Sequence, residues 1–286
     1  MEEEGAAHRK AITRFIKRMP SLSTTVGKVM EICSRTDASP NELNKVISLD
    51  PVLTGQVLKL INSAYYSLMN KVTSLTRAIT MLGMNTVKNM ALSTAIIRSV
   101  SGAKKSIALP TKQFWAHSIA TGVCAKLLAK ANGVPVMECE EYFVAGLLHD
   151  LGKIPFGDEY IDVLQKVKVD YLPLIDLERE MLGVDHQEVG RLIAEKWKLN
   201  EAMTSSIAFH HDVEAAPEEH RVRVAYVGLA NMYANILEFG YAGDPFPAAD
   251  GADVMLKITG LTWDMFGEVA TEVEEEIEKA QVFLQS

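Results

Sequence analysis

The sequence predicts an all-α protein with two helical subdomains. Apolar residues recur at three- and four-residue spacings in nearly every segment, whereas the strict alternation typical of strands is scarce. Polar capping residues followed by proline mark several helix starts. The chain has 286 residues, 48% of them hydrophobic and 23% charged, which is enough to build one large domain or two smaller ones.

Helix boundaries are clearest in the N-terminal half. Pro20 interrupts a first helix in "TRFIKRMPSLSTTVGKVMEICSR", after which apolar residues at helical spacing predict a second. Ser39 precedes Pro40 and Asp50 precedes Pro51, and a polar cap before a first-turn proline is typical of a helix start. Two further short helices are therefore expected here.

The polar stretch "SGAKKSIALP" predicts a subdomain boundary near Lys104 to Pro110. Helical segments continue beyond it, and the spacing of Asp185 and Glu188 predicts a capping box. A loop with Gly and Pro then precedes a final acidic helix, whose charges we interpret as a solvated face, with docking of a partner as the alternative. The expected parts are a lead-in helix (1–19), a first helical subdomain (20–105), a second helical subdomain (106–240) and a C-terminal loop with its acidic helix (241–286).

Composition argues against several classes of function. The formal net charge of −8 disfavours non-specific nucleic-acid binding, which needs clustered Lys and Arg. No apolar segment approaches the roughly 18 residues that cross a bilayer, so no membrane association is expected. The three cysteines, Cys33, Cys124 and Cys139, lie in apolar helical patterns without C-x-x-C spacing, which predicts buried reduced thiols and a cytoplasmic location.

Five of the seven histidines lie at the start, end or apolar edge of predicted helices in the second half: His117, His149, His186, His210 and His211. In "EEYFVAGLLHDLGKIPFGDE" the first histidine after the apolar run is followed directly by Asp150. Imidazoles bind first-row transition metals, and a carboxylate can bridge two ions, so a helical bundle could gather these side chains into a metal centre. The alternative is that each histidine is a helix cap or a satisfied core residue.

Four motifs, "FWAHS", "FVAGLLHDLGK", "GVDHQEVG" and "AFHHD", closely resemble in order and spacing the HDOD domain, a branch of the HD superfamily. The segments "SLDPVLTGQVLKLINSAYYSL" and "VTSLTRAITMLGMNTVKNMAL" are similar to the distinctive N-terminal part of that domain. The resemblance covers roughly Pro20 to Ile236. It implies that the second subdomain is an HD-superfamily-like helical bundle.

The resemblance also implies site residues, taken from the related HD-GYP cyclic-dinucleotide phosphodiesterases. On that basis Asp150 would bridge two metal ions, and Asp150 and Lys153 are the candidate catalytic residues, because the lysine matches one that lies near the substrate phosphate. The alternative for Lys153 is a solvated side chain after a helix end. The matching ligands are His117, His149 and Asp150 for one ion, and His186, His210 and His211 for the other.

Two departures from the family pattern argue against catalysis. Asn231, in "YVGLANMYANIL", stands where the superfamily has a last aspartate, and a neutral amide offers one weak oxygen and no charge. The first ion is therefore expected to be weakly held. After the paired histidines the chain runs "DVEAAPEEH" without a Gly-Tyr-Pro run, so cyclic di-GMP is not the expected substrate.

Two functions of different class follow. The favoured one is a bacterial HDOD signalling module that keeps the metal site, has little or no catalysis and acts on an unidentified protein partner. The alternative is a metal-dependent phosphohydrolase acting on a nucleotide or another phosphoester. Either would hold one or two divalent transition-metal ions, with iron or manganese favoured over zinc because three imidazoles and a bridging carboxylate suit higher coordination.

Overall fold

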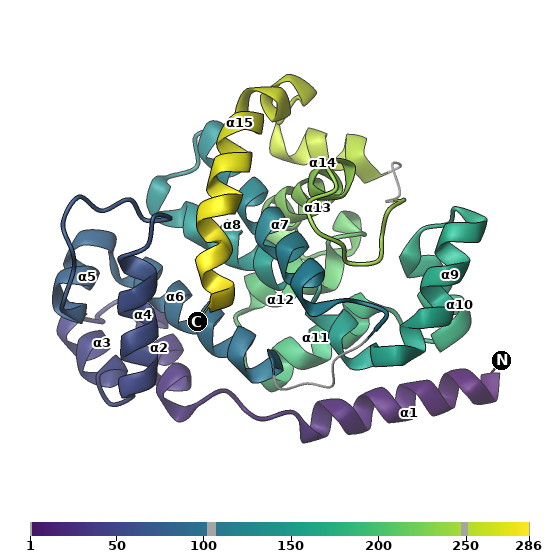
Figure 1. Ribbon diagram of the computed structural model, residues 1–286, viewed down its shortest axis with the longest axis horizontal. Coiled ribbons are helices and arrows are strands. Elements are labelled where there is room, and N and C mark those ends of the chain that lie inside the picture. Colours follow the sequence, from purple (N-terminus) through teal and green to yellow (C-terminus); the bar gives the residue numbers. More distant parts are fainter. Residues whose placement is uncertain (1, 102–106, 247–250, 286) are drawn as a thin grey trace.

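The computed structural model describes residues 2–101, 107–246 and 251–285, and regular structure within these ranges is helical, without a strand (Figure 1). The predicted all-α class is confirmed. In the N-terminal part the helices are α1 (Glu2–Arg18), α2 (Thr24–Ser34), α3 (Pro40–Ile47), α4 (Pro51–Ile61), α5 (Leu75–Leu82) and α6 (Met84–Ser101).

The second half contains the longest helices and several 3-10 turns. Its elements are α7 (Thr111–Ala131), α8 (Val136–Leu148), η1 (Leu151–Glu159), α9 (Tyr160–Asp170), α10 (Leu174–Leu182), α11 (His186–Lys196), α12 (Glu201–Phe209), η2 (Val213–Ala215), η3 (Glu218–His220) and α13 (Arg221–Ile236). The chain closes with α14 (Ala252–Thr259), α15 (Trp263–Ala280) and η5 (Gln281–Gln285).

The helix caps follow the sequence prediction. Ser39 Oγ accepts a hydrogen bond from the backbone of Glu42 at 3.2 Å, and the Glu42 carboxylate accepts one from the backbone of Ser39 at 3.4 Å, which is a complete capping box. Asp50 caps α4 by accepting from the backbone N–H groups of Val52 and Leu53. These caps satisfy amides that the first turn of a helix leaves unbonded.

The capping box predicted at Asp185 and Glu188 forms only its forward half. Asp185 accepts from the Glu188 backbone N–H at 2.8 Å. The Glu188 carboxylate instead pairs with Arg9 of α1 at 2.9 Å, and Arg9 also donates to the Gly183 carbonyl. A side chain that could have closed the box is thus used to dock α1 against the rest of the molecule.

Helix α1 lies along one side of the molecule and contacts α10, η1 and α11 (Figure 1). Lys196, the last residue of α11, donates from Nζ to the carbonyl oxygens of Ile16, Lys17 and Met19 at 2.5, 3.1 and 2.7 Å. These carbonyls lie at the C-terminal end of α1, where intrahelical partners run out. One ammonium group therefore binds the end of α1.

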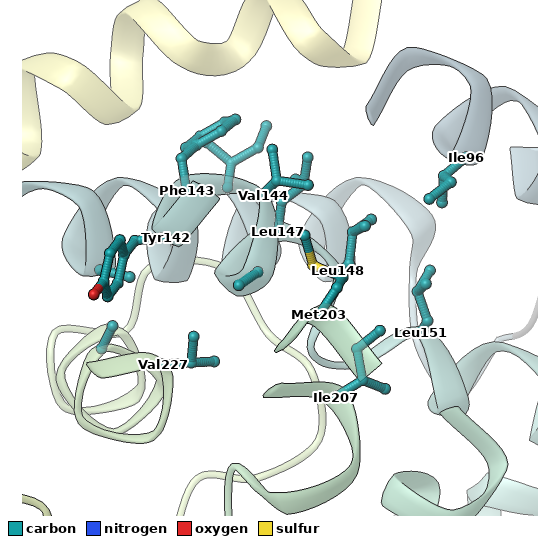
Figure 2. Packing of buried hydrophobic residues seen from close by; sticks show 14 of the residues in the cluster. Ile96, Tyr142, Phe143, Val144, Leu147, Leu148, Leu151, Met203, Ile207 and Val227 are labelled. Atoms are coloured by element: carbon teal, nitrogen blue, oxygen red, sulfur yellow. The ribbon is translucent and has the colours of Figure 1, made fainter. Parts of the chain in front are cut away.

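A single apolar core runs through the described residues and is centred on α7 and α8. Helix α7 packs against α8, α13 and α15. Figure 2 shows Phe143 and Val144 on one side of α8, and Met203 and Ile207 of α12 and Val227 of α13 on the other side; Leu147 and Leu148 of α8 belong to the same cluster. All are at most 3% exposed. This packing fixes the ends of α8 and α12, where the predicted metal ligands lie.

The two halves of the chain are also joined by buried polar contacts. Lys126 of α7 donates to the Tyr65 hydroxyl at 3.0 Å and pairs with the Glu140 carboxylate of α8. Tyr66 donates its hydroxyl to the same carboxylate at 3.4 Å. The boundary predicted near Lys104 to Pro110 lies partly outside the described residues, and the division into four parts stays a prediction.

Two further expectations concern membrane-spanning helices and the cysteines. No described helix combines the length and the apolar character needed to span a bilayer. The three cysteines are free, and Cys124 and Cys139 are buried as predicted, whereas Cys33 on α2 is only partly buried. Cys33 packs against the core and also lines a cavity, which leaves part of its surface open.

Candidate metal centre

The predicted ligands converge although they come from five separate segments. His117 lies in α7 and Asn231 in α13, while the other ligands lie at helix ends. His149 follows the last residue of α8, and Asp150 comes next. The second group is built from the first residue of α11 and the two residues after α12: His186, His210 and His211.

The cluster has two histidine groups that share one carboxylate. In each group the ligand atoms lie within 4.8 Å of one another, the first group being His117, His149 and Asp150 and the second His186, His210 and His211. One oxygen of Asp150, Oδ2, lies 3.2 Å from His149 Nε2 and 3.9 Å from His117 Nε2. Its other oxygen, Oδ1, lies 3.6 Å from His186 Nε2 and 3.7 Å from His210 Nε2. Asp150 therefore faces both groups, as a bridging ligand must.

Backbone and carboxylate acceptors orient three of the imidazoles. The Nδ1 atoms of His149 and His210 lie 2.6 and 3.0 Å from the carbonyl oxygens of Gly146 and Ile207. His186 Nδ1 lies 2.7 Å from a Glu178 oxygen. Because these acceptors take the Nδ1 proton, the Nε2 lone pairs point into the cluster, where His186 Nε2 and His210 Nε2 face each other at 3.3 Å.

Several atoms at the centre lack a hydrogen-bond partner, which fits a bound cation. The unpaired buried atoms include His149 Nε2, Asp150 Oδ1 and His211 Nε2. His149 Nε2 and the Asp150 carboxylate are close but are not aligned as a hydrogen bond. Unpaired buried polar atoms are rare, and imidazole nitrogens with a carboxylate are donors that divalent transition metals prefer. The residues present therefore fit such an ion.

The protonation of the cluster also suits metal binding. Burial and the neighbouring His149 lower the pKa of His117 to about 3, and burial lowers the pKa of His210 to about 3 as well. Burial raises the pKa of Asp150, but the nearby His149 and Lys153 outweigh it and hold the pKa well below its ordinary value. Neutral imidazoles beside an ionised carboxylate are the forms that bind metal.

Asn231 lies beside the first histidine group. Its Oδ1 is 2.9 Å from His117 Nε2 and also accepts a hydrogen bond from Asn235 Nδ2 at 3.1 Å. The side chain is 2% exposed. The amide oxygen thus faces the first histidine group without bringing a charge to it.

Lys153 is not a solvated side chain. It is 1% exposed, and its Nζ lies 2.7 Å from Asp150 Oδ2. The alternative weighed at the sequence level is therefore wrong, because η1 turns Lys153 back under Asp150. The ammonium group of Lys153 compensates the charge of the buried carboxylate.

Sequence reasoning missed the groups that hold the ligands in place. Glu178 of α10 is 0% exposed and accepts from both the backbone N–H and Nδ1 of His186, at 2.8 and 2.7 Å, and from the Tyr160 hydroxyl. Gln187 Oε1 accepts from the His211 backbone N–H at 2.8 Å. The available sequence signal was the position of Glu178, four residues after Leu174 and four before Leu182, because an acid on the apolar face of a helix is buried and therefore needs a partner.

Glycine allows the segments to approach closely. A Cβ on Gly152 would lie 1.8 Å from the carbonyl oxygen of His186 and 2.5 Å from the backbone nitrogen of Gly190. Only a residue without a side chain lets η1 pack directly on α11 here. In the sequence "HDLGK", Gly152 is therefore needed for packing, next to the two candidate ligands His149 and Asp150.

Comparison with known proteins supplies the family. The HDOD domain family model matches residues 19–213, which is more than half of the chain. The chain belongs to the HDOD family. An HDOD domain protein of unknown function from Geobacter sulfurreducens has a similar structure, with a TM-score of 0.80 and 24% identity over 99% of this chain and 98% of that one. A protein described as a candidate phosphohydrolase from Shewanella amazonensis has a TM-score of 0.71 and 22% identity, covering 96% and 98% of the two chains.

At these identities the structural matches show the HDOD fold alone. A curated relative, an uncharacterized protein of Treponema pallidum, is 29% identical over 232 residues, which are 80% of this chain and 44% of that protein. The HDOD chain thus spans less than half the length of this relative.

Proposed function

We propose that this HDOD chain is a bacterial signalling module in which a divalent ion at the His–Asp centre fixes the arrangement of the helices, with weak or no hydrolysis. The observation that carries this proposal is burial: the side chains of His149, Asp150 and His186 are 0% exposed, and those of His117 and His210 are 1% exposed. An ion surrounded in this way ties α7, α8, α11 and α12 together. Because the ion would bind only the folded chain, it would stabilise that chain by an amount that rises with the logarithm of the ratio of ion concentration to Kd.

The neutral Asn231 supports the same proposal. Two-metal hydrolysis needs both ions, one to orient the nucleophilic oxygen and one to support the phosphate. An ion at the first group would have two imidazoles, a shared carboxylate and an uncharged amide oxygen as its donors. We expect a firmly bound ion, iron or manganese rather than zinc, at the second group and a weakly bound one at the first.

The test combines metal analysis, thermal unfolding and hydrolysis. Purified protein is stripped with chelator and reloaded with iron, manganese, zinc or cobalt, followed by elemental analysis. We expect close to one tightly held ion, a raised unfolding temperature and negligible turnover of bis(p-nitrophenyl) phosphate. His210→Ala should lose the ion and the thermal shift, whereas His220→Ala, a histidine in η3 outside the cluster, should keep both. A stripped protein that takes up no ion would contradict the metal centre.

The second candidate is a metal-dependent phosphohydrolase for a nucleotide or another phosphoester. The observation that favours it is the placement of the two Asp150 oxygens toward two separate histidine groups, and the Shewanella amazonensis neighbour carries a phosphohydrolase name. In that case Lys153 would leave Asp150 for the substrate phosphate. If the parent protein hydrolyses bis(p-nitrophenyl) phosphate and the His210→Ala variant does not, this second candidate is favoured over the first.

A signalling module of this kind acts through another protein, and we propose that a partner in a cytoplasmic signalling pathway is the target. Pull-down from cell extract with stripped and with metal-loaded protein would test this. We expect a partner that binds the metal-loaded protein and not the stripped protein. A partner that binds both equally would contradict a role of the metal ion in signalling.

A further inference from the structure

A cavity of about 980 Å³ lies away from the metal centre, between the N-terminal helices and the segment joining α11 to α12. It shares no residue with the histidine cluster. Ligand sites commonly have volumes of about 300–1,000 Å³ and form where subdomains meet. The lining comes from the start and exposed face of α2, from α6, from one residue of α8 and from the α11–α12 connection.

The strongest indication of a ligand is Asn89. This residue of α6 lines the cavity and is 2% exposed, yet its side-chain Nδ2 has no hydrogen-bond partner. A buried amide donor without an acceptor is destabilising unless something else supplies the acceptor. The position therefore suits a ligand that carries a hydrogen-bond acceptor, such as the edge of a heterocyclic base.

The polar part of the lining favours an anion. Of its four lysines, Lys196 is bound to carbonyl oxygens at the end of α1 and Lys88 pairs with Glu141, so the cations that face the cavity without such a partner among the described residues are Lys28 and Lys198, against the one acid Glu31. Glu141 pairs with Arg223 at 2.8 Å as well as with Lys88 at 3.4 Å, so its charge is compensated without the other lysines. The start of α2, capped by Ser23 and without an acidic residue in its first turn, also faces this cavity. Free backbone N–H groups and the helix dipole favour a negative group there.

The remaining lining is apolar and includes long, adaptable side chains: Leu22, Met30, Leu92, Leu199 and Met203. Methionine side chains adjust to flat aromatic surfaces and make favourable contacts with them. An apolar wall, a buried donor and a cationic rim in one cavity together match a ligand with an aromatic ring system and an anionic group.

We propose that this cavity binds a purine nucleoside monophosphate, with the base against Met30, Leu92 and Met203, a base acceptor at Asn89 Nδ2, and the phosphate near Lys28 and the start of α2. The site is separate from the metal centre and does not depend on the function proposed for it.

Titration calorimetry on the full chain tests the proposal with four probes. AMP and GMP carry both base and phosphate, adenosine lacks the charge, and inorganic phosphate lacks the base. We expect AMP or GMP to bind at least tenfold more tightly than adenosine or phosphate alone. Equal binding of inorganic phosphate would overturn the base contact, and the absence of heat with all four probes would overturn the site.

Three variants locate the binding. Asn89→Leu removes the unpaired donor and should weaken nucleotide binding at least tenfold without lowering the unfolding temperature of the free protein. Lys28→Glu should weaken the binding of AMP and GMP but not the binding of adenosine. Lys45→Glu, an exposed lysine on α3 outside the cavity lining, is the matched charge control and should bind as the parent does. Parent-like binding by Asn89→Leu and Lys28→Glu would overturn the proposal.

Cys33 gives an independent readout because it lines the same cavity and is partly exposed, whereas Cys124 and Cys139 are 0% and 1% exposed. A bound nucleotide should slow alkylation of Cys33 by iodoacetamide several-fold, measured by mass spectrometry. The two buried thiols serve as internal references. Alkylation of Cys33 at an unchanged rate under saturating AMP and GMP would place any nucleotide elsewhere.

Discussion

At the scale of single residues, the candidate metal centre depends on how its histidines and Asp150 are oriented as much as on which residues they are. Asp150 is 0% exposed and faces four imidazoles and one ammonium group. Burial raises the pKa of its carboxyl, but His149 and Lys153 outweigh burial and hold this pKa well below the ordinary value. Each imidazole with an assigned Nδ1 acceptor presents Nε2 to the centre. We therefore expect substitutions of the candidate ligands and substitutions of the groups that accept their Nδ1 protons to have different effects on metal binding.

Asn231→Asp is expected to increase metal content and any hydrolytic activity from a low baseline. The new carboxylate would lie 2.9 Å from His117 Nε2 in place of the amide oxygen and would keep the hydrogen bond from Asn235. A full negative charge added to this donor set should hold an ion that exchanges in the parent. Elemental analysis after dialysis measures the gain.

Asn200→Asp is the matched control for that variant. Asn200 caps α12 through Oδ1, and an aspartate caps equally well, so the control adds the same charge away from the ligands. A parent that already holds two tightly bound ions, or an Asn231→Asp protein with unchanged metal stoichiometry, would contradict the prediction.

Glu178→Gln is expected to lower metal affinity by about 10- to 100-fold, the usual effect of losing a charged partner behind a ligating histidine. The amide keeps the shape of the side chain but accepts less strongly from His186 Nδ1 and the His186 backbone. Competition with a chelator measures the affinity. Glu180→Gln, an exposed neighbour on α10, should leave it unchanged.

At the scale of elements, close contact between η1 and α11 brings Asp150 to His186. Gly152→Ala would place a methyl group 1.8 Å from the His186 carbonyl oxygen, so one segment must move. We expect a loss of several degrees in unfolding temperature together with weaker metal binding. The control is Gly267→Ala in α15, where nothing lies within 4 Å and the substitution should stabilise by about 0.5–1 kcal/mol. Unchanged metal binding in Gly152→Ala would show that the contact is not needed.

The sequence was sufficient for most helices and for choosing the side chains that lie together in the cluster, but not for the groups that orient them. Caps at Ser39 and Asp50 are local, since a residue and its amide partners lie within one turn. The contact between Glu178 and His186, or between Gly152 and the His186 carbonyl, depends on how two helices cross, which spacing alone does not specify. Lys153 was ambiguous for the same reason.

At the scale of the whole molecule, buried neutral histidines make the metal-free protein sensitive to acid. The pKa values of His117 and His210 lie at about 3 in the fold against 6.5 ordinarily. Between these values the unfolded chain binds protons that the folded chain does not, so the free energy of unfolding falls as the pH falls from about 6.5 toward 3. The slope approaches about 1.4 kcal/mol per pH unit for each histidine.

Urea denaturation of chelator-treated protein, carried out at several pH values between about 7.5 and 5, measures how the free energy of unfolding depends on pH. Metal-loaded protein is the reference, because a bound ion competes with protons for the same nitrogens. A stability of the stripped protein that stays constant across this range would contradict the buried, neutral state of the two histidines.

Helix α11 connects the histidine cluster to the end of α1. It begins with His186 at the metal centre and ends with Lys196, whose ammonium is bound to three carbonyl groups of the lead-in segment. Eleven residues of α-helix span about 16 Å and transmit displacement with little bending. The position of α11 is therefore fixed at both ends, by His186 in the histidine cluster and by the hydrogen bonds from Lys196 to the end of α1.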